Sequence, residues 1–531
     1  MRKIVLLTLL FVATSTMKAQ MTLDASTPLK KLVNATQALF YLYVDTVNEQ
    51  KNVEKAIKGM LKELDPHSTY STPKEVEEMK EPLEGSFEGI GVQFNMIEDT
   101  LVVIQPTMNG PSEKVGITAG DRIVSVNDTS IAGVKMARRD IMKRLRGKKG
   151  TKVKLGIVRR GVDGIQTFIV IRDKIPVKSI DAFYLVRPNK ADEANDIGYI
   201  RIGNFGATTH EEFMNAVTEL QKKGMKRLII DLQDNGGGYL QSAAMIANEF
   251  LEQGDMIVYT EGRSIKRQEY HAQGNGRLKD IPIVILTNEF TASAAEIIAG
   301  AMQDHDRGTI VGRRSFGKGL VQRPLEFDDG SMIRLTIAHY FTPTGRCIQK
   351  PYTKGQLKDY EMDLENRLKH GELTNPDSIH FNDSLKVFTL KKHRPVYGGG
   401  GIMPDHFVAL DTLQYTRFHR KIAAKSILMN ASLKYIDDNR KRLKREYPTF
   451  EGFLYSYETP QSLIDNIIAE AAKQDIRPKD DDELQRTIPF MRHQLKALVA
   501  RDIWDMSEYF YVINEQNDIY RKGLEEISAL K

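Results

Sequence analysis

An alternation of apolar runs with helical patterns, beginning at residue 198, constrains the fold of this chain more than any other feature. The apolar runs are GYIRIGNF (198–205), KRLIIDLQ (226–233) and IPIVILT (281–287), and helical patterns such as TTHEEFMNAVTELQKKG lie between them. Strands that alternate with helices predict βαβ units and a largely parallel sheet. Ligands of such sheets gather beyond the carboxyl ends of the strands. The segments DNGGG (234–238) and NEFTAS (288–293) both fall at such ends.

Ser293 stands where the third apolar run gives way to the helical pattern SAAEIIAGAM. One interpretation is a helix cap, because Ser-Ala-Ala-Glu matches a capping box. In such a box the serine hydroxyl caps the helix and the Glu296 side chain reaches back to the serine N–H. Another is a nucleophile, because the N–H groups of a helix N-terminus stabilise a developing oxyanion. The two roles do not exclude each other.

Lys318 follows in RRSFGKGLVQRPLEF, between two glycines that remove bulk around it. The run continues as an apparent strand, on which positions i and i+4 project from one face, so Lys318 and Gln322 are expected to point the same way. Burial lowers the pKa of a lysine toward the range of a general base. A surface lysine in a hairpin is the alternative.

Residues 85 to 177 change to short strand-like runs with Gly and Asn-Asp turns and one helical pattern, MARRDIMKRLRG. This pattern predicts a small, mostly β domain. With GIGV at the start of its first strand and the run AGDRIVSVN, the segment resembles a PDZ domain of bacterial proteases. The resemblance implies that Ile90, Gly91 and Val92 bind the terminal carboxylate of a peptide that adds as a strand.

Taken together, TASAAE, FGKGLVQ, LIIDLQDNGGG, LDPHS before a PDZ-like segment and an export signal resemble the C-terminal processing peptidases, a family of Ser-Lys proteases. The resemblance spans roughly residues 35 to 355. It implies that Ser293 is the nucleophile, Lys318 the general base and Gln322 its supporting residue. The backbone N–H groups of Gly237 and Ala294 are the implied oxyanion donors. Gly236 departs from the family's usual N-P-G-G, which loosens this loop.

Other chemistries fit less well. Gly312 to Lys318 matches G-x-x-x-x-G-K, but Gly319 replaces Ser/Thr and a strand follows, which argues against a P-loop. The histidines lack metal-ligand spacing, and Ser293 lacks a G-x-S-x-G surround. His67 and Ser68 are neighbours on one turn, which favours a structural role. We expect no cofactor and no metal.

The N-terminus reads as a secretory signal, with the basic start MRK, the apolar run IVLLTLLFVA and a cut after Ala19. An uncleaved anchor or a core helix is the alternative. Removing Arg2, Lys3 and Lys18 lowers the formal net charge from +6 to +3, which gives no argument for nucleic acid. We expect an exported, periplasmic protein that is soluble after signal removal.

The predicted fold class is multidomain α+β: an α/β protease core, a mainly β PDZ-like domain inserted after a helical N-terminal region, and a helical C-terminal domain. The predicted boundaries are 1–19 signal, 20–84 helical region, 85–177 PDZ-like domain, 178–355 Ser-Lys protease core, 356–408 loop-rich extension and 409–531 helical domain. The helical domain is expected to serve internal packing or homo-oligomer formation.

The predicted function is an exported serine endopeptidase that binds C-terminal tails of proteins and cleaves peptide bonds through an acyl-enzyme. Its partners are then protein or peptide substrates with accessible tails. A non-catalytic periplasmic peptide-binding or scaffold protein of the same fold is the alternative function. The paired presence of Ser293 and Lys318 favours the enzyme.

Overall fold

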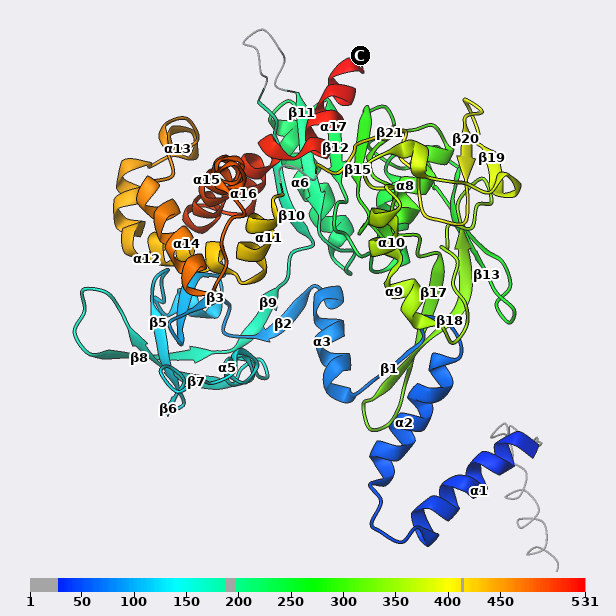
Figure 1. Cartoon of the computed structure of the whole chain (residues 1–531), viewed down its shortest axis with the longest axis horizontal. Coiled ribbons are helices and arrows are strands. Elements are labelled where there is room, and N and C mark those ends of the chain that lie inside the picture. Colours follow the sequence, from blue (N-terminus) through cyan, green and yellow to red (C-terminus); the bar gives the residue numbers. More distant parts are fainter. Residues whose placement is uncertain (1–26, 188–195, 412–414, 531) are drawn as a thin grey trace, which may run out of the picture.

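The computed structural model describes residues 27–187, 196–411 and 415–530, so the predicted signal segment lies outside the described residues. Helices open this part of the chain (Figure 1). They are α1 (Thr27–Leu42), α2 (Glu49–Lys62) and α3 (Pro73–Glu84), with the short strand β1 (Thr69–Ser71) before α3. Helix α3 starts at a capping box between Thr72 and Glu75, with Pro73 in its first turn.

The segment predicted to resemble a PDZ domain is a sheet with two small helices. Its elements are β2 (Ser86–Gly89), β3 (Val92–Ile97), β4 (Thr100–Pro106), α4 (Pro111–Lys114), β5 (Arg122–Val126), β6 (Thr129–Ser130), α5 (Arg138–Leu145), β7 (Lys152–Val158), β8 (Ile165–Ile171) and β9 (Asp173–Pro176). The strand order is β3-β4-β5-β7-β8, so β3 lies at an edge of the sheet. Strands β2 and β9 pair with each other where the chain enters and leaves.

A six-stranded sheet forms the centre of the larger unit. Its strands, in spatial order, are β10 (Ile180–Leu185), β11 (Ile197–Ile202), β12 (Arg227–Asp231), β15 (Ile283–Thr287), β16 (Thr309–Gly312) and β21 (His406–Phe407). Only the β10–β11 pair is antiparallel, and the other pairs are parallel. The predicted βαβ units are therefore confirmed.

Both faces of this sheet are covered, and side chains alternate between them with the period of a strand. Ile230 and Ile285 face the core that contains α6 (Thr209–Lys222), α7 (Leu240–Asn248) and α8 (Ala294–Asp304). Ile229 and Val284 face the opposite core, where Tyr520 and Ile527 of α17 (Asp518–Ala529) pack. Helix α17 thus covers one face of the sheet whose strand β15 leads to the predicted nucleophile.

A second sheet places the predicted lysine strand. Its order is β1-β18-β13-β14, with β17 paired to β18. The elements are β13 (Met256–Glu261), β14 (Gln268–His271), β17 (Leu320–Glu326) and β18 (Met332–Phe341). The following loop-rich segment contains α9 (Leu357–Glu361), α10 (Asp363–Lys369), β19 (Lys386–Phe388) and β20 (Pro395–Tyr397).

The C-terminal helices lie beside the core and over the strands of residues 85–177 (Figure 1). They are α11 (Arg417–Ala424), α12 (Ile427–Glu446), α13 (Phe450–Ser456), α14 (Gln461–Lys473), α15 (Asp481–Ile503), α16 (Met506–Ile513) and α17. Their apolar stripes form two cores of their own, around Ile464 and around Phe453. This packing uses the stripes internally, and self-association through them stays a prediction. The predicted multidomain α+β fold class is confirmed.

Within the described residues, no helix has both the length and the hydropathy that crossing a membrane requires.

Candidate active site

Ser293 lies on a strained turn between β15 and α8. Its backbone φ of 58° is in the left-handed region, which is uncommon for a residue other than glycine. Such strain persists where the surroundings enforce it and clusters at functional sites. Here the Ser293 N–H donates to Glu296 Oε2 at 2.8 Å, and the Ser293 carbonyl oxygen accepts from Tyr340 Oη at 3.0 Å. The half-buried serine is therefore held by its backbone on both sides.

The Glu296 carboxylate joins the turn at Ser293 (the serine turn) to residues 315–318 (the lysine loop). It accepts hydrogen bonds from the N–H groups of Ser293 (2.8 Å), Gly317 (2.8 Å) and Lys318 (2.9 Å), and from the Ser315 hydroxyl (2.5 Å). A single oxygen, Oε2, accepts from both Ser293 and Lys318. Complete burial raises the pKa of Glu296, and these donors oppose that rise. The sequence indicates Glu296 only as a cap partner, so its bonds to the lysine loop were missed.

Lys318 and Gln322 meet as predicted, but not on one strand. Lys318 lies two residues before β17 begins, and the pairing register of β17 shifts between Val321 and Gln322. The side chains still converge, because Lys318 Nζ donates to Gln322 Oε1 at 3.1 Å. The i, i+4 strand geometry that predicted this contact was wrong, and a loop with a bulge produces it instead.

The surroundings of Lys318 favour its neutral amine. Burial lowers the pKa of Lys318 to about 8, and the positive charge of Arg334 acts in the same direction. The negative charges of Glu296 and Asp65 act against it. A substantial fraction of this amine is therefore neutral in mildly alkaline solution, as a general base requires.

The turn that contains His67 holds Gln322 in place. The Gln322 amide nitrogen donates to the His67 carbonyl oxygen, which leaves its Oε1 directed at Lys318. The His67 ring contacts the Tyr360 hydroxyl at 2.8 Å, and burial, followed by the charge of Lys318, lowers the pKa of His67 to about 4. Asp65 ties the turn together by accepting from the His67 N–H at 2.9 Å. These are structural contacts, but the carbonyl bond across 255 residues has no signal in the sequence.

Gly237 and Ala294, the implied oxyanion donors, flank the serine. A Cβ atom added at Gly237 would lie 2.7 Å from the Ser293 Cβ, so only glycine fits there. The Gly237 N–H donates to Asn235 Oδ1 at 2.8 Å, and its use as an oxyanion donor requires exchange of that bond. Ala294 is the first residue of α8, where helical geometry provides no acceptor within the helix for its N–H.

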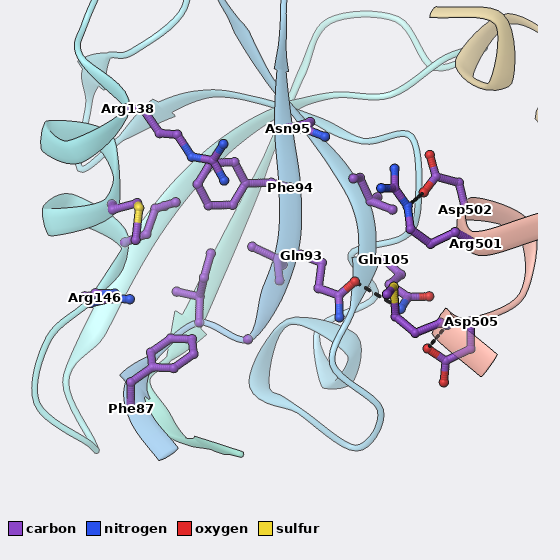
Figure 2. A pocket seen from close by; sticks show the side chains of 17 residues that line it. Phe87, Gln93, Phe94, Asn95, Gln105, Arg138, Arg146, Arg501, Asp502 and Asp505 are labelled. Atoms are coloured by element: carbon purple, nitrogen blue, oxygen red, sulfur yellow. Dashed lines mark hydrogen bonds and ion pairs between the residues drawn. The ribbon is translucent and has the colours of Figure 1, made fainter. Parts of the chain in front are cut away.

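Ile90, Gly91 and Val92 line a groove of about 430 Å³, which Figure 2 shows and which includes none of the residues named above around Ser293. Gly91 has a φ of 69°, and the Ile90 carbonyl oxygen accepts from the Ser112 hydroxyl at 2.6 Å. The groove follows β3, the edge strand of its sheet. A peptide strand can add at such an edge.

Comparison with known proteins identifies the family. Residues 196–362 match peptidase family S41, residues 89–166 a PDZ domain and residues 11–74 the activating protease CtpB N-terminal domain. Carboxy-terminal processing protease CtpA of Bacillus subtilis (strain 168) is 36% identical over 351 residues, which cover 64% of this chain and 73% of that protein. The chain belongs to the C-terminal processing peptidases. The predicted family is confirmed, and the protein is a serine-type peptidase rather than a non-catalytic scaffold.

Two further similarities extend over most of this C-terminal processing peptidase. CtpB of the same Bacillus strain is 34% identical over 377 residues, which cover 69% of this chain and 77% of that protein. The solved photosystem II D1 C-terminal processing protease is 26% identical and covers 73% of this chain and 95% of that chain, with a TM-score of 0.36. Residues 418–505 match a family of unknown function (DUF8443). The PDZ domain and the protease family together indicate peptide or protein substrates.

Proposed function

We propose that this peptidase is an exported endopeptidase that captures C-terminal tails with its PDZ domain and cleaves peptide bonds with a Ser-Lys dyad. Ser293 is the nucleophile, Lys318 the general base and Gln322 the residue that orients the base. The N–H groups of Gly237 and Ala294 stabilise the oxyanion. The protein acts in the periplasm after removal of residues 1–19.

In the acylation step, the neutral Lys318 amine takes the proton of the Ser293 hydroxyl as Oγ attacks the scissile carbonyl carbon. The tetrahedral oxyanion is stabilised by backbone N–H groups. When the C–N bond breaks, the Lys318 ammonium gives its proton to the leaving amine. In deacylation the same amine takes a proton from water, whose oxygen attacks the ester carbonyl carbon. As the C–Oγ bond breaks, the Lys318 ammonium returns the proton to Ser293 Oγ.

One observation supports the dyad more than any other: a single buried carboxylate oxygen, Glu296 Oε2, accepts from the amides of both Ser293 and Lys318. This contact fixes the two backbones next to each other before substrate arrives. Rates depend steeply on such preorganisation. The lowered pKa of Lys318, to about 8, provides the neutral base that the mechanism needs.

A serine-reactive phosphonate probe tests the proposal directly. Intact protein is treated with the probe, digested and mapped by mass spectrometry. We expect the adduct on Ser293, and we expect it to be lost in Lys318→Ala. Lys350→Ala is a matched control, because Lys350 is also a buried lysine but pairs with Asp363 at 2.9 Å. An adduct on another serine, or equal labelling of Lys318→Ala, would refute the dyad.

A further inference from the structure

The groove along β3 has two walls that come from distant parts of the chain. Figure 2 places Phe87, Arg138 and Arg146 on one side of the strand and Arg501, Asp502 and Asp505 on the other. The first wall belongs to the PDZ domain and its helix α5. The second belongs to the corner between α15 and α16 in the C-terminal helical region. Both walls therefore line the groove that a strand added to β3 would enter.

The second wall is fixed to the PDZ domain. Asp437 on α12 forms ion pairs with Arg122 and, at 3.1 Å, with Arg160 of the PDZ domain. At the corner itself, Arg440 donates to the carbonyl oxygen of the buried Asp502 at 2.6 Å. The wall is also fixed to the protease core, because α16 packs against β10 and α17 against β15. The corner is thus a rigid part of the groove.

We propose that the C-terminal helical region, which includes residues 418–505, is part of the tail-recognition site and reads alternate side chains of the bound tail. This inference rests on the proposed capture of C-terminal tails. Successive side chains of an extended peptide point to opposite faces. With its carboxylate at Ile90 to Val92, the last and third-from-last side chains meet the first wall, where Phe87 and Leu145 offer apolar surface. The penultimate and fourth-from-last side chains then meet the α15–α16 corner.

The charges at the α15–α16 corner indicate which side chains of a bound tail it favours. Arg501 Nε donates to Asp502 Oδ1 at 2.7 Å, so these two charges neutralise each other. Asp505 is exposed and accepts from the Met506 N–H at 2.7 Å as the cap of α16. In the described part of the chain, no cation forms an ion pair with Asp505. The exposed carboxylate of Asp505 favours lysine or arginine at the penultimate or fourth-from-last position of the tail.

Residues 527–530 of this chain lie away from the groove. Arg227 on β12 donates to the carbonyl oxygens of Ile527 (3.2 Å), Ser528 (3.3 Å) and Leu530 (3.4 Å). These bonds keep residues 527–530 on the core sheet. The proposed occupant of the groove is the tail of another protein that carries basic residues near its terminal carboxylate.

Fluorescence anisotropy with labelled peptides tests this inference on the full chain carrying Ser293→Ala, which prevents cleavage. The peptides share an alanine at the end and a valine third from the end, and carry lysine, alanine or glutamate at the penultimate and fourth-from-last positions. We expect the affinity to be highest for the lysine peptide, lower for the alanine peptide and lowest for the glutamate peptide. Asp505→Asn keeps a capping side chain, and it should reduce the lysine-over-glutamate preference by about two- to fivefold. Asp480→Asn is the matched control, because Asp480 caps the other end of α15 away from the groove.

The possible results distinguish the role of the α15–α16 corner from the capture of C-terminal tails. Binding that requires a free carboxylate, but keeps its charge preference in Asp505→Asn, would overturn the role of the corner and leave tail capture intact. Absence of carboxylate-dependent binding would overturn both proposals. Loss of preference in Asp505→Asn but not in Asp480→Asn supports the second wall.

Discussion

The serine site and the groove along β3 are built in opposite ways. The serine, lysine and glutamine of the serine site come from one short stretch, residues 293–322, in which a buried carboxylate joins the backbone of Ser293 to that of Lys318. The groove comes from segments that are hundreds of residues apart, and its central strand is at the edge of its sheet. Cleavage of a bond needs reacting groups that are fixed before the substrate binds. Recognition of a peptide by strand addition needs unpaired backbone groups at a sheet edge.

The sharpest test of this division is Lys318→Ala. Without the base, we expect cleavage of a quenched fluorescent peptide to fall by roughly 10⁴-fold or more. Binding of a tail peptide in the groove should not change, because the groove does not include Lys318. Equal loss of binding and cleavage would show that the two regions are not independent.

Glu296→Ala should also disable only the serine site. It leaves four buried or half-buried donors without their acceptor, so we expect a loss of about 3 kcal/mol or more in the free energy of unfolding. The serine turn and the lysine loop also lose their common bond, and we expect kcat/KM to fall at least ~100-fold. Urea unfolding and peptide cleavage measure the two effects. Wild-type kcat/KM in a destabilised variant would contradict a role of Glu296 in holding Ser293 next to Lys318.

The groove has its own test in the peptide terminus. Amidation of a tail peptide removes its charge and should weaken binding by about tenfold or more, because hydrogen bonds to a charged group are lost. Gly91→Ala should weaken binding further, since its Cβ would approach Ile175 Cδ1 to 2.9 Å at a φ of 69°. Gly116→Ala, at a φ of 85° in open space, controls for backbone strain. Cleavage of short peptides without a tail should persist in both variants.

Gln322→Ala removes one neutral hydrogen bond to the base. We expect kcat to fall by about two- to tenfold with KM nearly unchanged, because the lysine remains but is less well oriented. Gln322→Glu adds a negative charge beside the amine and should raise the pKa of Lys318. A change in KM alone would argue that Gln322 contacts substrate instead.

The smallest expected effect is on the pH profile. The proposed mechanism uses the neutral form of Lys318 as the base, so kcat/KM should rise with pH and be half-maximal near the lowered pKa of about 8. Arg334→Met removes a charge that lowers this pKa, so the profile should move to higher pH by a fraction of a unit. An unchanged or more acidic midpoint would contradict the role of Arg334. Tail binding should not follow this titration.

Sequence predicted the parts that depend on local pattern. The alternation around Ile230 and Ile285 specified the parallel sheet, and Ser293, Lys318 and Gln322 stood in recognisable motifs. It missed contacts that only folding brings together, such as the His67 carbonyl at Gln322 and the corner of α15 and α16 at the groove. Main-chain carbonyls leave no residue signature, and the C-terminal helices showed only amphipathic stripes.

The packing of α17 makes the core sheet depend on a segment that follows the other C-terminal helices. One face of the sheet whose strand β15 leads to Ser293 is covered by Ile519, Tyr520 and Ile527. Ile229 and Val284 pack against these residues on that side. Proteolytic nicking between α16 and α17 would therefore put an interface between two fragments inside the protease core, and loss of α17 would expose apolar surface on the sheet.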